Sequence, residues 1–86
     1  MPELSRFYGI VIKMHHDEHN PPHFHAVYGG HRAQFSLKGI RLIKGKVPLR
    51  VQSLVREWAA QHLDELTEDW TLCQSNQLPK SIEPLD

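Results

Sequence analysis

Apolar and polar residues alternate with a period of two over much of the first half of the chain. Over residues 7–14, Ile10, Ile12 and Met14 share one face, whereas Lys13 lies on the other. Aromatic and β-branched residues with this period are typical of a strand that is buried on one side. The pattern therefore predicts a first strand over residues 7–14.

A β-hairpin and a further short strand are expected next. Residues 23–28 and 32–37 both alternate, and the Gly29-Gly30 pair between them suits a turn with positive φ. The Asn20-Pro21-Pro22 segment ahead of the hairpin predicts a loop, because proline fixes φ and lacks an amide donor. An apolar run at residues 40–43, bounded by glycines, predicts a fourth, short strand.

The hydrophobic period changes to 3.6 after Pro48, which indicates amphipathic helix. The apolar stripe consists of Val51, Leu54, Val55, Trp58, Ala59, His62, Leu63, Leu66 and Trp70. Pro48 suits a first helical turn, where its missing amide has no partner, and Asp64 could begin a second helix or continue the first. The remaining residues, 77–86, are rich in proline and predict an extended tail that docks through Ile82 and Leu85.

These elements predict one α+β domain over residues 1–86. Its antiparallel sheet of three or four strands spans about residues 6–44, and one long or two shorter C-terminal helices, from about 48 to 76, pack on one face. A chain of 86 residues has room for a single core. A hydrophobic fraction of 40% and a charged fraction of 23% exclude the disordered class.

Composition also narrows the cellular context. No apolar run approaches the roughly 18 residues that a membrane span needs, and the N-terminus lacks the layout of a signal peptide, so we expect a cytoplasmic protein that does not bind membranes. The single cysteine, Cys73, excludes a small scaffold held by internal disulfides. We expect its thiol to be a small buried apolar group.

Charge is strongly segregated although the formal net charge is zero. Residues 32–56 contain seven basic and no acidic residues, whereas residues 57–86 contain seven acidic residues and one lysine. Two interpretations stay open: complementary surfaces within one fold, or a basic face for nucleic acid or an acidic partner. The candidate contact residues are Arg32, Arg41, Lys44, Lys46 and Arg50.

Histidines are concentrated in one short segment. Six of the seven lie within residues 15–31. His23 and His25 are two apart on a predicted strand, so their imidazoles point to the same side and could bind one metal ion or one anionic group together.

A third metal ligand could come from the preceding loop. His19 is the first candidate, with Asp17 or Glu18 as a carboxylate alternative, giving an open site for a divalent ion such as zinc. His23 and His25 could instead act as catalytic acid and base. The remaining alternative is that the histidines lie on a solvated rim, which we expect for His15, His16 and His31.

Several segments resemble one small bacterial family. They are Ser5-Arg6-Phe7-Tyr8-Gly9-Ile10-Val11-Ile12, His19-Asn20-Pro21-Pro22-His23-Phe24-His25, Tyr28-Gly29-Gly30, Gly45-Lys46-Val47-Pro48, Glu57-Trp58-Ala59, the helical segment from His62 to Trp70, and Ile82-Glu83-Pro84-Leu85. The chain resembles the family named domain of unknown function 4160. The resemblance implies a neighbouring gene for a second small protein, in a pairing similar to a toxin–antitoxin module.

Three functional hypotheses follow. The leading one is a component of such a two-gene module that binds a small protein partner and also nucleic acid. The second is a small metal-dependent hydrolase or nuclease that uses His19, His23 and His25. The third is a structural adaptor without catalysis. No glycine-rich phosphate loop is present, because Gly29-Gly30 is followed by a strand rather than a helix.

Overall fold

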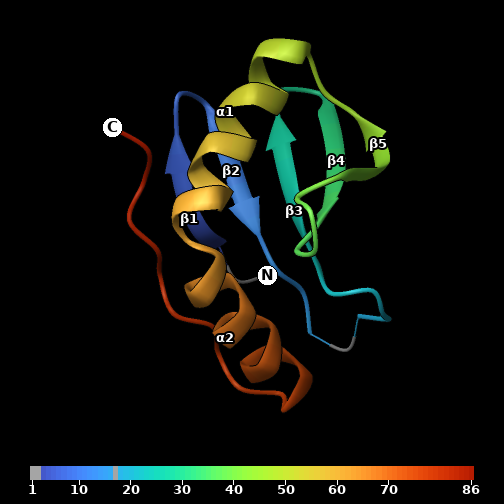
Figure 1. The fold of residues 1–86 in the computed structure, drawn as a ribbon, viewed down its shortest axis with the longest axis vertical. Coiled ribbons are helices and arrows are strands. Elements are labelled where there is room, and N and C mark those ends of the chain that lie inside the picture. Colours follow the sequence, from blue (N-terminus) through green and yellow to red (C-terminus); the bar gives the residue numbers. More distant parts are fainter. Residues whose placement is uncertain (1–2, 17) are drawn as a thin grey trace.

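The computed structural model describes residues 3–16 and 18–86, which form a five-stranded sheet and two helices (Figure 1). The elements are β1 (Glu3–Phe7), β2 (Ile10–Lys13), β3 (His23–Tyr28), β4 (His31–Ser36), β5 (Leu42–Lys46), α1 (Leu49–Gln61) and α2 (Leu63–Gln74). The α+β class is confirmed. The expectation of three or four strands is wrong, because the sheet has five, in the sequential order β1-β2-β3-β4-β5 with every pair antiparallel.

The additional strand arises where the sequence predicts one strand over residues 7–14. The chain instead turns at Tyr8 and Gly9, with φ of 50° and 79°, and Phe7 pairs with Ile10. Positive φ at two successive residues is the geometry of a tight hairpin turn, and it is uncommon for a tyrosine. Tyr8 therefore favours a strand in the sequence, because it is aromatic, although the structure places it in a turn.

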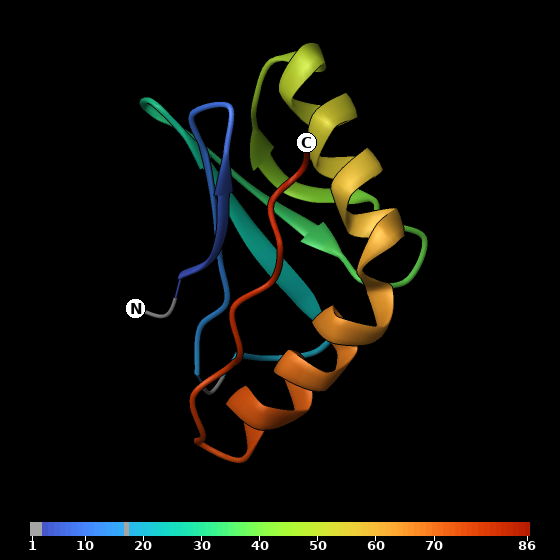
Figure 2. The same cartoon turned by 90° about the vertical axis from the view of Figure 1, so that its left-hand side faces the viewer.

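The core lies between one face of the sheet and the helices. Figure 2 shows both helices on the same side of the sheet. Ile10, Ile12 and Met14 are fully buried, as their alternation predicts. Trp58 of α1 lies at the centre, with its ring 5.4 Å from that of Phe7. Neither of the two helices that the structure describes covers the opposite face of the sheet, which we call the open face.

The helical region is two helices rather than one. His62 separates α1 from α2 with φ of −130°, outside the helical range, and its amide donates to the carbonyl of Ala59. Asp64 lies in the first turn of α2, and the N-cap residue of this helix is His62, which makes no side-chain capping hydrogen bond. Among the residues that the structure describes, no helix has the length and apolar character needed to cross a membrane.

The tail after α2 is extended, as predicted, and is bound to the body by hydrogen bonds. The amide of Ile82 donates to the carbonyl of Leu4 at 2.8 Å, and the indole of Trp58 donates to the carbonyl of Glu83 at 2.8 Å. The Tyr8 hydroxyl donates to the carbonyl of Asp86. The tail thus connects α1 to the edge of the sheet at β1 and covers the helix side, which leaves the open face free.

Candidate functional site

A row of polar side chains crosses four strands on the open face. Lys13 of β2 pairs with His25 of β3, His25 pairs with Gln34 of β4, and Gln34 pairs with Lys44 of β5. The neighbouring core-facing residues of these strands are buried, so alternation directs this row outward. Three strand spacings of about 4.8 Å give the row a length of roughly 14 Å.

A second row lies beside the first. Val11 pairs with Val27, Val27 with Arg32, and Arg32 with Lys46. Between the two rows the face is hollowed by a pocket of about 320 Å³. Its lining consists of Lys13, His15, His25, Ala26, Val27, Arg32, Ala33, Gln34, Lys44 and Gly45. The open face therefore combines four basic side chains with an apolar floor.

Gly45 allows β5 to approach β4 closely. It has φ of 83°, and a Cβ atom at this position would lie 2.2 Å from the carbonyl oxygen of Arg32. Only glycine fits such a close backbone approach at positive φ. The glycine between Lys44 and Lys46 thus holds both lysines beside Arg32 and Gln34.

The structure divides the five predicted basic contact residues between two sides of the molecule. Arg32, Lys44 and Lys46 lie on the open face, and Lys13 joins them although the sequence did not single it out. Arg41 instead lines a separate hollow that includes Arg56 of α1. Arg50 is exposed in the first turn of α1, on the helix side.

The basic block does not pair with the acidic block. Within residues 3–16 and 18–86, the ion pairs of lysine and arginine side chains are Arg6 with Glu3 and Lys80 with Glu68. Lys13, Arg32 and Lys44 therefore form no salt bridge among these residues, although Lys13 lies across from Glu3 in the β1–β2 pair. This geometry gives no support to the interpretation of the charge segregation as internal complementarity.

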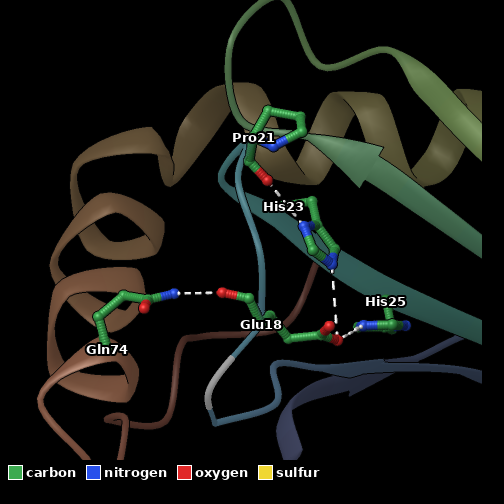
Figure 3. A network of polar contacts seen from close by, with 5 residues as sticks. All are labelled: Glu18, Pro21, His23, His25 and Gln74. Atoms are coloured by element: carbon green, nitrogen blue, oxygen red, sulfur yellow. Dashed lines mark hydrogen bonds and ion pairs between the residues drawn. The ribbon is translucent and has the colours of Figure 1, made fainter.

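Four residues from β3 and the loop before it meet at one end of the open face, and Figure 3 shows three of them, Glu18, His23 and His25. The Nε2 atom of His25 donates to Oε1 of Glu18 at 2.6 Å, and Nε2 of His23 lies 3.5 Å from the same oxygen. The ring of His15 stacks obliquely on that of His25, with centroids 4.0 Å apart. Ligand atoms of His15, Glu18 and His25 all lie within 4.8 Å of one another. We call His15, Glu18, His23 and His25 the histidine–glutamate cluster.

Contacts from outside the cluster position its members. The side-chain amide of Gln74 in α2 donates to the backbone carbonyl of Glu18 at 2.9 Å, which links the loop to the helix. The Nδ1 atom of His23 donates to the carbonyl of Pro21 at 2.8 Å, and the ring packs 5.4 Å from that of Trp70. The Pro-Pro bend thereby fixes the orientation of the buried imidazole.

Burial and mutual charge set the protonation of the cluster. Burial lowers the pKa of His25, although the hydrogen bond to Glu18 acts in the opposite direction. Burial and the charge of His25 lower the pKa of His15. Burial raises the pKa of Glu18, but the hydrogen bond from His25 and the nearby imidazoles outweigh it, and the net shift is downward. At neutral pH the geometry thus favours neutral His15 and His25 beside an ionised carboxylate.

The cluster differs in part from the predicted ligand set. His23 and His25 lie together with ring centroids 5.2 Å apart, but His23 is only 5% exposed and His25 is the accessible one of the two. His19 is exposed and does not belong to the group that could hold a metal. Asp17, the carboxylate alternative, lies outside the described residues.

His15 is the functional candidate that sequence reasoning missed, since we expected it on a solvated rim. Its position follows from the strand period: Ile12 and Met14 face the core, so Lys13 and His15 face the open side. The antiparallel pairing of Lys13 with His25 then brings His15 beside His25. The sequence signal that could have identified His15 is the alternation of the predicted strand, residues 7–14, continued for one more residue.

Two other predictions concern residues away from this face. Cys73 is fully buried, as expected, and burial raises the pKa of its thiol, which makes it a poor nucleophile. His31 is exposed at the start of β4, as expected for a solvated histidine.

Comparison with known families places four of the five strands and most of the helical region in one of them. The sequence model of the family described as "Domain of unknown function (DUF4160)" matches residues 9–71. Comparisons with curated proteins and with solved structures found no match. The matched segment covers β2 to β5, α1, most of α2 and the whole histidine–glutamate cluster. The chain therefore belongs to the domain of unknown function 4160 family.

Proposed function

We propose that this protein binds the sugar–phosphate backbone of single-stranded nucleic acid on its open face. The observation that carries the proposal is the group of four basic side chains that form no salt bridge with the described acidic residues, Lys13, Arg32, Lys44 and Lys46, which line or flank one hollow. Backbone phosphates bind to such cations in a largely sequence-independent way.

The chemistry of the face argues for backbone contacts rather than base readout. Its centre carries Val11 and Val27, and the aromatic rings that line the hollow among the described residues are the imidazoles of His15 and His25 at one end, so the face offers little area on which bases stack. Gln34 is the neutral donor and acceptor in the row. We therefore expect weak sequence preference and strong salt dependence.

The test is fluorescence anisotropy with a labelled RNA single strand of mixed sequence at several salt concentrations. Four phosphate contacts predict a slope of log affinity against log salt of about −3. Lys13→Gln/Lys44→Gln should weaken binding and flatten this slope. Arg41→Gln/Arg50→Gln, which removes the same charge from the helix side, is the matched control and should retain both. Equal losses in the two variants would refute binding on the open face.

The proposal extends to a protein partner, which is the role that the two-gene pairing implied by the family resemblance suggests. The acidic first turn of α2, with Asp64 and Glu65, lies on the helix side and leaves the open face available for nucleic acid. We propose that a small protein encoded by a neighbouring gene binds this chain, in a toxin–antitoxin-like module. Growth arrest by the untagged chain, relieved by co-expression of the neighbour, is the expected result. Normal growth in both strains would contradict this part.

A second candidate function is hydrolysis of the bound backbone. The favouring observation is the 2.6 Å hydrogen bond between His25 and Glu18 at the end of the open face, an arrangement in which a carboxylate orients an imidazole that acts as a base. Because His23 is buried, His25 is the catalytic residue in this candidate, and His23 is a positioning residue. Cleavage of RNA by the wild type but not by a folded His25→Ala variant would support it, and equal stability of RNA with both would refute it.

A further inference from the structure

The histidine–glutamate cluster contains an unsatisfied arrangement of polar atoms. A carbonyl oxygen can only accept a hydrogen bond, so the contact with Pro21 requires a proton on Nδ1 of His23. Its Nε2 atom is buried and has no hydrogen-bond partner among the described residues. That nitrogen lies 3.5 Å from Oε1 of Glu18, beyond ordinary hydrogen-bond distance. A buried imidazole nitrogen and a carboxylate oxygen thus converge without a close contact.

Such an arrangement is typical of a site that binds a cation. Buried polar atoms in native proteins are nearly always satisfied, so each exception needs a cause. Here the unpartnered nitrogen of His23 points toward the carboxylate of Glu18, which also contacts His25. A positive ion beside Glu18 would give this carboxylate a partner at the place where the imidazole nitrogens converge.

We propose that His15, Glu18 and His25 bind one divalent transition-metal ion of the zinc class, with His23 beside them as a positioning residue for Glu18. Ligand atoms of the first three lie within 4.8 Å of one another. A tetrahedral ion with bonds of about 2.0–2.1 Å needs ligands about 3.3 Å apart, so modest side-chain rotations complete the set.

The ligand types determine which ions fit. Two imidazoles and one carboxylate suit zinc, iron(II) or nickel, whereas magnesium and calcium prefer oxygen ligands alone. Three protein ligands leave at least one position open to water or another oxygen ligand. Because His15 and His25 also line the hollow on the open face, that position faces the basic side chains. The site stands independently of nucleic-acid binding, because its ligands do not include the four basic residues.

The ligand set differs from the one that the sequence predicts, and the difference provides the control. His15 replaces His19, which is exposed and lies outside the group. His19→Gln and His15→Gln remove the same chemical group four residues apart, so they separate the two possible sets. His31→Gln, at the exposed first residue of β4, controls for general histidine effects.

The experiment is calorimetric titration of the protein, without a histidine tag, with ZnCl₂, together with the visible absorption of added Co²⁺. The wild type should bind one ion per chain at micromolar concentration and give a tetrahedral Co²⁺ spectrum, with no competition from excess Mg²⁺. His15→Gln and His25→Gln should abolish both signals, and His23→Gln should weaken affinity by about 10–100-fold, as expected for a residue that orients a ligand. His19→Gln and His31→Gln should match the wild type.

Three results would overturn the proposal: no binding by the wild type, unchanged binding by His15→Gln, or equal loss in His19→Gln. If a ligand variant fails to fold by circular dichroism, NMR of the wild type decides the question. Co²⁺ should then broaden the ring resonances of His15 and His25 before those of His19 and His31. Uniform broadening of all imidazoles would count against the site.

Discussion

Single residues show most clearly where the physical chemistry of this small fold is demanding. Asp69 of α2 is completely buried, and only one of its carboxylate oxygens is satisfied, by the amide of Lys80 at 2.8 Å. Burial raises the pKa of this carboxyl. The residue thus connects the tail to α2 at the expense of placing a titratable group in the core.

Asp69 predicts a pH dependence of stability. Because its pKa in the folded protein lies above the unfolded value of 3.8, the folded state holds a proton that the unfolded chain has already lost. This contribution to stability is present below that value and disappears as pH rises through the folded pKa. Asp69→Asn removes it, while keeping an oxygen that accepts from Lys80.

The prediction is checked by urea unfolding of both proteins from about pH 4 to neutral pH. The free energy of unfolding of Asp69→Asn, relative to the wild type, should increase with pH and then level off. Any constant cost of the new amide, about 1–3 kcal/mol if it stays unpartnered, does not alter this shape. A difference that stays flat over this pH range for Asp69→Asn would contradict the account.

The limits of sequence reasoning at this scale are visible at His15 and Tyr8. His15 belongs to the cluster because the alternation of the strand continues past Met14. That alternation is present in the sequence, although we expected His15 on a solvated rim. Tyr8 occupies a positive-φ turn that a tyrosine rarely adopts, so its sequence signal favours the wrong conformation. The approach of Glu18 depends on a loop held by Gln74 from α2, a contact 56 residues distant that no local pattern encodes.

At the scale of elements, periodicity predicted most of the sheet and the helical stripe. The buried positions Val51, Val55, Trp58 and Ala59 of α1 all belong to the predicted stripe. The sequence allows either one long helix or two shorter ones, because the apolar stripe continues through His62, where the structure has a break. Hydrophobic period describes which side of an element is buried, but it does not report a change of direction between two helices.

The docked tail predicts unequal effects of two similar substitutions. Ile82 is 4% exposed and donates its amide to Leu4, whereas Leu78 is 78% exposed. Ile82→Ala should lower the free energy of unfolding by about 2–4 kcal/mol, because it removes buried methylenes and leaves a cavity. Leu78→Ala should change it by less than about 0.5 kcal/mol. Chemical denaturation measures both, and similar values for the two would show that the tail does not pack as described.

Two glycines with positive φ predict a second contrast in stability: Gly29, in the turn between β3 and β4, and Gly45, in β5. Gly29 has φ of 56° with no atom within 4 Å of a built Cβ, so Gly29→Ala should cost about 1–2 kcal/mol from backbone strain alone. Gly45→Ala adds a clash with the backbone of Arg32 and should be more destabilising. It should also displace Lys44 and Lys46 and weaken binding of nucleic acid. Thermal unfolding of the two variants tests the order, and an equal or smaller effect at Gly45 would refute the close approach of β5.

At the scale of the whole molecule, the fold divides the basic residues of one sequence block between two sides of the molecule. The sequence places seven basic residues in one segment, but strand alternation and the position of α1 decide which of them share a face. Lys13, from a different block, joins Arg32 and Lys44 through strand pairing. Residue composition alone cannot identify such a surface, because its members come from separate strands.

The open face is the central claim, and an NMR titration tests it most directly. Unlabelled single-stranded RNA is added to ¹⁵N-labelled protein, and amide shifts are followed residue by residue. The account predicts that the largest changes occur in β2 to β5 at Lys13, His25, Gln34 and Lys44, while the amides of α2 stay unchanged. Changes concentrated on the helices, or none at concentrations that saturate binding, would contradict it.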